Sequence, residues 1–288
     1  MGSSPSKGSS VLSTPTGTTD FLHIVKSHNI HDLDTARVYN NGKSEELLGA
    51  INAHSDFAIS TKAPGFTPNS LSYDAILENS RLSHEALKQD RVDIHLHGPD
   101  PATPLTDQCR AFGKLYRDGR FSRFGEGYPL PSVYQGAYNP VHRAAEKGLF
   151  PTLRRLKIAF YAWGPLAGGL LAKPIEQLLR PEEGTRYAEM PIFANMYLKE
   201  SNIAALKRMN EVCVGAGMSM MEATMRWMMH HSGLMEQDGV VLGASSKEQI
   251  GETLSACEKG PLPESVVQGW EELWRDVVES GTALPVPT

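Results

Sequence analysis

The chain has 288 residues, 40% of them hydrophobic, and a formal net charge of −5. This is enough apolar material to bury one substantial core, and it is compatible with a single α/β domain. Lysine and arginine are scattered among acidic residues, which excludes a basic stripe for nucleic acid or an anionic membrane and favours a small-molecule partner.

The three cysteines, Cys109, Cys213 and Cys257, are widely spaced and form no CxxC or Cys/His ligand pattern. We therefore expect neither a disulfide framework nor a metal site, and a reducing compartment such as the cytoplasm. The apolar runs are far shorter than the roughly 20 residues that cross a bilayer, so we expect no membrane contact.

Residues 1–19 are rich in Ser, Thr, Gly and Pro and lack the apolar stretch of a signal peptide. This composition predicts a flexible leader over 1–19 and one folded domain over 20–288.

Beyond the leader, short β-like runs alternate with longer segments of helical spacing, which indicates parallel βα units. The predicted strands are Asp32–Ala36, Phe57–Lys62, Val92–His97, Phe121–Gly125, Val133–Tyr138, Ile158–Trp163 and Val240–Gly243. The predicted helices are Asp20–Ser27, Ser44–Ala53, Ser70–Lys88, Thr106–Asp118, Phe150–Lys157, Asn202–Gly215, Ser219–His231, Lys247–Cys257 and Pro263–Glu279. This order is typical of a (β/α)8 TIM barrel.

Two places depart from a complete barrel. Only Glu126 to Ser132 separate two strands that should be parallel neighbours, whereas such a connection needs a dozen or more residues. The leader also contains no convincing strand. We therefore expect an incomplete (β/α)8 barrel that lacks its first strand and its fifth helix.

A chemically suggestive motif runs from Asp34-Thr-Ala through Tyr39 to Gly42, Ser44-Glu45 and Leu-Gly49. It places Asp34 at the carboxyl end of a strand, which is the active face of a βα barrel. With Ile59-Ser-Thr-Lys62, Val92–Asp100 and Val133–Asn139, it resembles the aldo-keto reductase superfamily. The runs Phe160–Leu171, Met225–Ser232 and Leu242–Gln249 are similar to the aflatoxin-aldehyde-reductase branch.

The resemblance implies a catalytic tetrad of Asp34, Tyr39, Lys62 and His97 and the NADPH-dependent reduction of an aldehyde or ketone, of dialdehyde or secondary-metabolite type. Tyr39 would donate the proton. Lys62, held by Asp34, would favour the phenolate of a side chain whose ordinary pKa is about 10. His97 would hydrogen-bond the carbonyl oxygen and orient it.

Each member of the tetrad also has a structural interpretation. Asp34 could be an ordinary cap or turn residue, Lys62 a solvated strand end and His97 a satisfied core histidine. His95 competes with His97, but His97 precedes Gly-Pro-Asp100, and on a regular strand His95 points to the opposite face.

Neither a GxGxxG motif after a strand nor a GxxxxGK[ST] motif is present, so the nucleotide must be bound in another way. The resemblance implies that Gln135 bonds the nicotinamide amide, Trp163 stacks on its ring, and a loop, helped by Arg186, holds the pyrophosphate. The loop residues are Gly164, Pro165, Leu166, Ala167, Gly168, Gly169, Leu170 and Leu171. A plain turn is the alternative.

For the adenosine end, the resemblance implies contacts from Ser245, Ser246, Lys247 and Gln249 to the 2′-phosphate at a helix start. Thr253 stands where the family often has an adenine-contacting Asn. Ordinary helix capping by Ser245 or Ser246 is the alternative interpretation.

The main departure from the family is Phe124-Gly-Glu-Gly-Tyr-Pro129, where relatives carry Gly-Leu-Ser-Asn and then the fifth helix. A second hypothesis follows: a truncated, non-catalytic relative that acts as a binding or regulatory subunit, or a mis-spliced product. The sequence fixes neither the carbonyl substrate nor the oligomeric state, for which a homodimer is one candidate.

Overall fold

The structure is a computed structural model that describes residues 11–121, 132–183, 186–189, 194–195 and 197–283. The chain forms two compact units. Unit 1 comprises Met1–Ser132 with Gly243–Lys247, and unit 2 comprises Val133–Leu242 with Glu248–Thr288. Each unit is described by itself.

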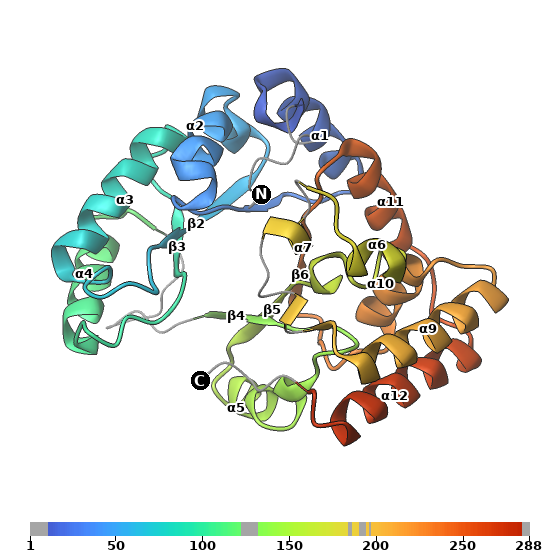
Figure 1. Ribbon diagram of the computed structural model, residues 1–288. Coiled ribbons are helices and arrows are strands. Elements are labelled where there is room, and N and C mark those ends of the chain that lie inside the picture. The colour runs from blue at the N-terminus through green and yellow to red at the C-terminus, as the bar shows by residue number, and fades with distance from the viewer. Residues whose placement is uncertain (1–10, 122–131, 184–185, 190–193, 196, 284–288) are drawn as a thin grey trace. The chain divides into compact units, whose positions relative to one another are not determined.

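Unit 1 contains a parallel sheet in the order β1 (Asp32–Asp34), β2 (Ala58–Ala63) and β3 (Asp93–Leu96). The register pairs Leu33 with Ile59 and Thr61 with Ile94. The connecting helices are α2 (Lys43–Ala50) and α3 (Tyr73–Leu87), and α4 (Leu105–Arg117) follows β3. These three helices lie along one side of the sheet (Figure 1). Strands joined by helices give the parallel order that the sequence predicts.

Helix α1 (Pro15–Ser27) begins five residues before the helix that the sequence predicts. The Thr14 side chain accepts a hydrogen bond from the Gly17 N–H at 3.1 Å, and Pro15 occupies the first helical turn, where its missing N–H costs nothing. Gly17 and Thr18 are buried. Residues 15–19, which composition assigns to the leader, therefore belong to α1.

The core of unit 1 lies between the sheet and its helices. A Cβ on Gly49 would lie 1.9 Å from the Ala86 carbonyl oxygen, so the α2 and α3 backbones approach as closely as they do only because this residue is glycine. The buried residues of this core include Ala63, Leu71, Ile76, Ala111, Phe112, Leu115 and Phe121.

Unit 2 contains a second parallel sheet in the order β4 (Val133–Ala137), β5 (Ala159–Trp163) and β6 (Gly239–Val241). Its helices are α5 (Leu149–Arg155), α6 (Ile175–Leu179), α7 (Arg186–Glu189), α9 (Glu200–Gly215), α10 (Met220–His230), α11 (Lys247–Cys257) and α12 (Glu264–Glu279). Large fully buried side chains fill the core, among them Tyr138, Phe160, Met209, Trp227 and Trp270.

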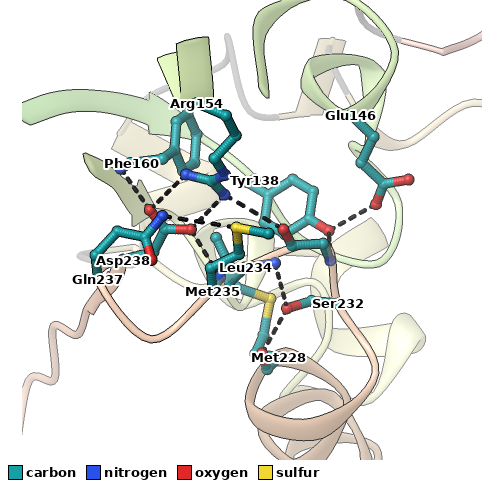
Figure 2. A network of polar contacts seen from close by, with 11 residues as sticks. Tyr138, Glu146, Arg154, Phe160, Met228, Ser232, Leu234, Met235, Gln237 and Asp238 are labelled. Atoms are coloured by element: carbon teal, nitrogen blue, oxygen red, sulfur yellow. Dashed lines mark hydrogen bonds and ion pairs between the residues drawn. The ribbon is translucent and has the colours of Figure 1, made fainter. Parts of the chain in front are cut away.

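A polar network stabilises unit 2 around Asp238 (Figure 2). The Asp238 carboxylate is fully buried and accepts from both outer nitrogens of Arg154, at 2.9 and 2.5 Å. It also accepts from the backbone N–H groups of Phe160 and Met235, both at 2.8 Å. A buried carboxylate with this many donors is compensated for its loss of hydration. The network joins α5 and β5 to the turn before β6.

Six of the predicted strands are present within one to two residues of their predicted ends. The seventh, Phe121–Gly125, falls largely outside the described residues, as does the segment 126–131. Among the residues that the structure describes, no helix is both long enough and apolar enough to cross a membrane.

Candidate active site

Two strand ends bring Asp34 and Lys62 together. Asp34 is the last residue of β1, Lys62 lies near the end of β2, and the parallel register pairs Asp34 with Ser60. The Lys62 Nζ donates to Asp34 Oδ2 at 2.5 Å and to the Thr35 carbonyl oxygen at 2.8 Å. The lysine side chain is only 2% exposed. Its ammonium group is therefore fixed at the carboxyl edge of the sheet.

The loop after β1 carries Tyr39. Its N–H donates to the Ala36 carbonyl oxygen at 3.0 Å, and Asn40, Asn41 and Gly42 then take three consecutive left-handed conformations. Asparagine and glycine tolerate that region better than other residues, so the Asn-Asn-Gly sequence permits this tight turn. The turn places the Tyr39 ring centroid 5.1 Å from the Lys62 Nζ.

His97 completes the group from the end of the third strand. Its N–H donates to the Ala63 carbonyl oxygen at 3.1 Å, which extends the β2–β3 pairing by one residue. The His97 and Tyr39 ring centroids are 5.5 Å apart in an edge-to-face arrangement. Phe66, which is 68% exposed, has its ring centroid 5.5 Å from that of His97. Sequence reasoning gave Phe66 no role. The side chain of its competitor, His95, is not described.

The positions of these groups shift two pKa values. Burial is the main cause of the lowered pKa of Lys62, and the charges of Asp34 and Glu45 oppose it. Burial also lowers the pKa of His97, helped by the positive charge of Lys62 and opposed by Asp34. His97 is therefore a neutral imidazole at neutral pH.

A second carboxylate, Glu45 of α2, contacts β2 through Thr61. In the sequence it stood out only as part of the Ser44-Glu45 motif. Its side chain is fully buried in the first turn of α2. Oε1 accepts from Thr61 Oγ1 at 2.5 Å and from Ser83 Oγ at 2.8 Å, and Oε2 accepts from Arg37 at 3.2 Å. The position of this glutamate in the sequence, three residues after a turn glycine, does not predict that it is buried. Its contacts depend on segments that only folding brings together.

The residues that the resemblance assigns to the nicotinamide end lie in unit 2. Gln135 is half-buried in β4, and Trp163 ends β5 with 37% of its surface exposed. In the following loop, Gly164, Gly168 and Gly169 have positive φ angles. Four of the loop amides, from Ala167, Gly169, Leu170 and Leu171, donate to carbonyl oxygens within the loop itself. The Ala167 carbonyl oxygen accepts from the Tyr187 hydroxyl at 2.9 Å.

The other proposed cofactor residues lie in, or directly before, two helices, α7 and α11. Arg186 begins α7, and its side chain is not described. Ser245 and Ser246 directly precede α11, and Lys247 Nζ pairs with Asp20 Oδ2 at 2.9 Å. Thr253 is buried, and its hydroxyl donates to the Gln249 carbonyl oxygen in its own helix. Phe124–Pro129, the main departure from the family pattern, lies outside the described residues.

Comparison with known proteins decides the family. A model of the aldo/keto reductase family matches residues 7–275. The chain belongs to this family. It is 38% identical to human aldo-keto reductase family 7 member A3, with 84% of each chain covered. It is 37% identical to the oxidoreductase sirO of Leptosphaeria maculans, with 92% of this chain and 87% of that protein covered. It is 35% identical to human aflatoxin B1 aldehyde reductase member 4, with 84% of each covered.

These matches confirm the predicted superfamily and its aflatoxin-aldehyde-reductase branch. An aldo-keto reductase is an oxidoreductase, and its family fold is a (β/α)8 barrel, with which the parallel strands of each sheet agree. In the part of the chain that the structure describes, no group of three or more His, Cys, Asp or Glu side chains is placed to hold a metal ion.

Proposed function

We propose that this aldo-keto reductase is a cytoplasmic enzyme that reduces an aldehyde or ketone to the alcohol with NADPH. The observation that carries this proposal is the convergence of Asp34, Tyr39, Lys62 and His97 from three successive strand ends of unit 1. A tyrosine near a buried ammonium, with an imidazole at its edge, supplies the proton side of a carbonyl reduction.

Tyr39 donates its phenolic proton to the carbonyl oxygen. The Lys62 ammonium favours the phenolate that remains, because a positive charge near the ring stabilises the charged form. Asp34 holds the lysine in place and opposes the effect of burial on it. The neutral His97 ring offers a hydrogen bond to the same carbonyl oxygen and orients it beside Tyr39.

The residues that the resemblance assigns to the cofactor are of chemical types that suit a nicotinamide dinucleotide. Gln135 offers an amide, Trp163 an exposed aromatic face and the loop 164–171 a glycine-rich backbone. Lys247, with Ser245, Ser246 and Gln249, offers a cation and a helix start to a phosphate. When bound, NADPH supplies the hydride that reaches the carbonyl carbon.

The substrate that we propose is an aldehyde, of dialdehyde or secondary-metabolite type. The names of relatives support this class, because two human relatives are called aflatoxin B1 aldehyde reductases. The exposed Phe66 ring beside His97 would favour an apolar or aromatic group next to the carbonyl.

Replacing the proposed proton donor tests this function directly. Tyr39→Phe should keep NADPH binding and lose roughly 10²- to 10⁴-fold in kcat for aldehyde reduction, because only the proton transfer is removed. The measurement is NADPH consumption with a panel of aldehydes. Tyr73→Phe, a tyrosine of α3 in the same unit, is the matched control and should retain activity. Full activity of Tyr39→Phe would overturn the assigned role.

A second candidate function has its own observation. Helix α4 ends at Arg117 and β4 begins at Val133, so residues 118–132 would have to hold both a strand and the fifth barrel helix. That span is too short for both. We infer that the barrel is incomplete. The predicted absence of a first strand belongs to the same proposal. Such a chain could serve as a binding or regulatory subunit, or be a mis-spliced product.

Transcript sequencing separates these versions. A transcript that restores about 25 residues after Gly125, enough for a helix and its loops, would identify a splicing product. Without that transcript, a chain that unfolds cooperatively and binds no NADPH is the regulatory version. The homodimer remains a prediction.

A further inference from the structure

Glu45 is a fully buried carboxylate next to the proposed proton-donating pair. Its side chain has no exposed surface, although it carries a negative charge. Such a charge is costly to bury unless it is paired and hydrogen-bonded. Glu45 meets this requirement through Arg37, Thr61 and Ser83 and through the amino end of α2, whose dipole favours a negative group.

Two of the three side chains that bond Glu45, those of Arg37 and Thr61, belong to the segments that carry Tyr39 and Lys62. Arg37 lies on the loop two residues before Tyr39, and its guanidinium also donates to the Gly42 carbonyl oxygen at 3.5 Å, at the far end of the same turn. Thr61 is the residue of β2 immediately before Lys62. One carboxylate therefore connects the loop of the proton donor to the strand of the lysine.

The turn itself explains why such an anchor is useful. Asn40 and Asn41 are both left-handed, a conformation that residues other than glycine keep only when the surrounding structure holds them in it. A Cβ on Gly42 would lie 2.7 Å from the Arg37 guanidinium carbon, so the turn is packed directly against this side chain. The ion pair from Arg37 to Glu45 holds that packing in place.

The negative charge of Glu45 also favours the protonated form of Lys62. The charged and titratable groups around the lysine are Asp34 from β1, Tyr39 from the loop, His97 after β3 and Glu45 from α2. Burial lowers the pKa of Lys62, and the negative charge of Glu45 opposes that change.

We propose that Glu45 is a positioning residue that holds the Tyr39 loop against β2, next to Lys62. This inference rests on the proposed carbonyl reduction and gives Glu45 no contact with the substrate. It acts through Arg37 on the tyrosine and through its charge on the lysine.

Glu45→Gln keeps the shape of the side chain and removes its charge, and two measurements on the full chain follow its effect without any turnover. Amide hydrogen exchange of residues 35–42, which include the Tyr39 N–H, should become roughly tenfold faster or more, because the loop loses its ionic anchor. The pKa of Lys62, followed by NMR of its side chain, should fall below its wild-type value.

Glu46→Gln is the matched control. Glu46 is the next residue of α2, is 59% exposed and lies 3.6 Å from the same arginine. An exposed pair of this kind contributes little, so both measurements should stay at their wild-type values. Equal behaviour of Glu45→Gln, Glu46→Gln and wild type would overturn the proposal.

Arg37→Gln is the second variant, which decides the case if Glu45→Gln does not fold. It should speed the exchange of residues 35–42 like Glu45→Gln, but it removes a positive charge and should not lower the pKa of Lys62. A purely structural role for Glu45 would change the exchange and leave the lysine titration as it is. Wild-type exchange of the Tyr39 N–H in Arg37→Gln would contradict the anchor.

In active enzyme, the kcat of Glu45→Gln should fall by roughly tenfold or more with KM little changed, since a misplaced donor affects the chemical step. The alkaline limb of its kcat profile should move to lower pH, because loss of a negative charge lowers the pKa of Lys62. An inactive wild type refutes the proposed reduction, whereas the exchange and titration measurements still decide the role of Glu45.

Discussion

His97 has a lowered pKa for two reasons that act together: its partial burial and the nearby Lys62 ammonium. The pKa in the folded chain therefore lies below the ordinary value of 6.5, which the unfolded chain retains. As the pH falls through 6.5, the unfolded chain binds a proton first, so folding stability declines until the pH reaches the folded pKa. His97→Gln should lose less stability than wild type between neutral and mildly acidic pH in urea unfolding. If the unfolding stability of wild type and variant changed with pH in the same way, the lowered pKa of His97 would be contradicted.

Single functional residues could be predicted from the sequence where a reactive side chain stands at the end of a predicted strand. Asp34, Tyr39, Lys62 and His97 follow successive predicted strands, and parallel strands bring such ends to one edge, where the structure places all four. Glu45 and Phe66 could not be assigned in this way. The burial of Glu45 depends on Thr61 and Ser83, which are far from it in sequence, and the exposure of Phe66 depends on the loop around it.

Helix α10 begins at a side-chain cap. Ser219 Oγ accepts from the Glu222 N–H at 3.1 Å, which satisfies one of the free amides at the helix start. Ser219→Ala should lower the free energy of unfolding by about 1 kcal/mol, whereas Ser219→Gly should cost only a few tenths, because glycine is itself tolerated at this position. Denaturant unfolding of both variants provides the test. Equal losses would show that the hydroxyl bond is not the stabilising feature.

Element boundaries were predictable where the local signal is strong. Helix α11 has the bounds Lys247–Cys257 that the sequence predicts, since Ser245-Ser246 precede its periodic residues. The start of α1 was missed because Thr14, Pro15 and the following Gly and Thr residues suggest a flexible segment by composition alone. The local cap at Thr14 and the burial of Thr18 decide otherwise, and the burial requires tertiary packing.

The whole molecule depends on two cores, each with its own buried polar anchor. In unit 2, Asp238→Ala would leave Arg154 and the amides of Phe160 and Met235 without their acceptor (Figure 2). Breaking a buried pair of this kind should lower unfolding stability by about 3 kcal/mol or more. Asp276→Ala, which removes an exposed partner of Arg208, is the control and should change stability by about 1 kcal/mol at most. Similar losses in the two variants would contradict the anchoring role of Asp238.

At the same scale, the parallel α/β class followed from the alternation of strands and helices, because a parallel connection needs a crossover. The division into two compact units could not be predicted from the sequence, because it depends on which segments pack together. Residues 243–247, for example, belong to unit 1 although they follow most of unit 2 in the chain.

The central proposal is that this chain binds NADPH. The most direct measurement is a titration of the purified chain with NADPH, followed by quenching of tryptophan fluorescence, because Trp163 is the proposed stacking partner of the nicotinamide. Saturable quenching at one site per chain, weakened in Trp163→Ala, is the result expected. Absence of saturable binding by the folded chain would contradict the proposal.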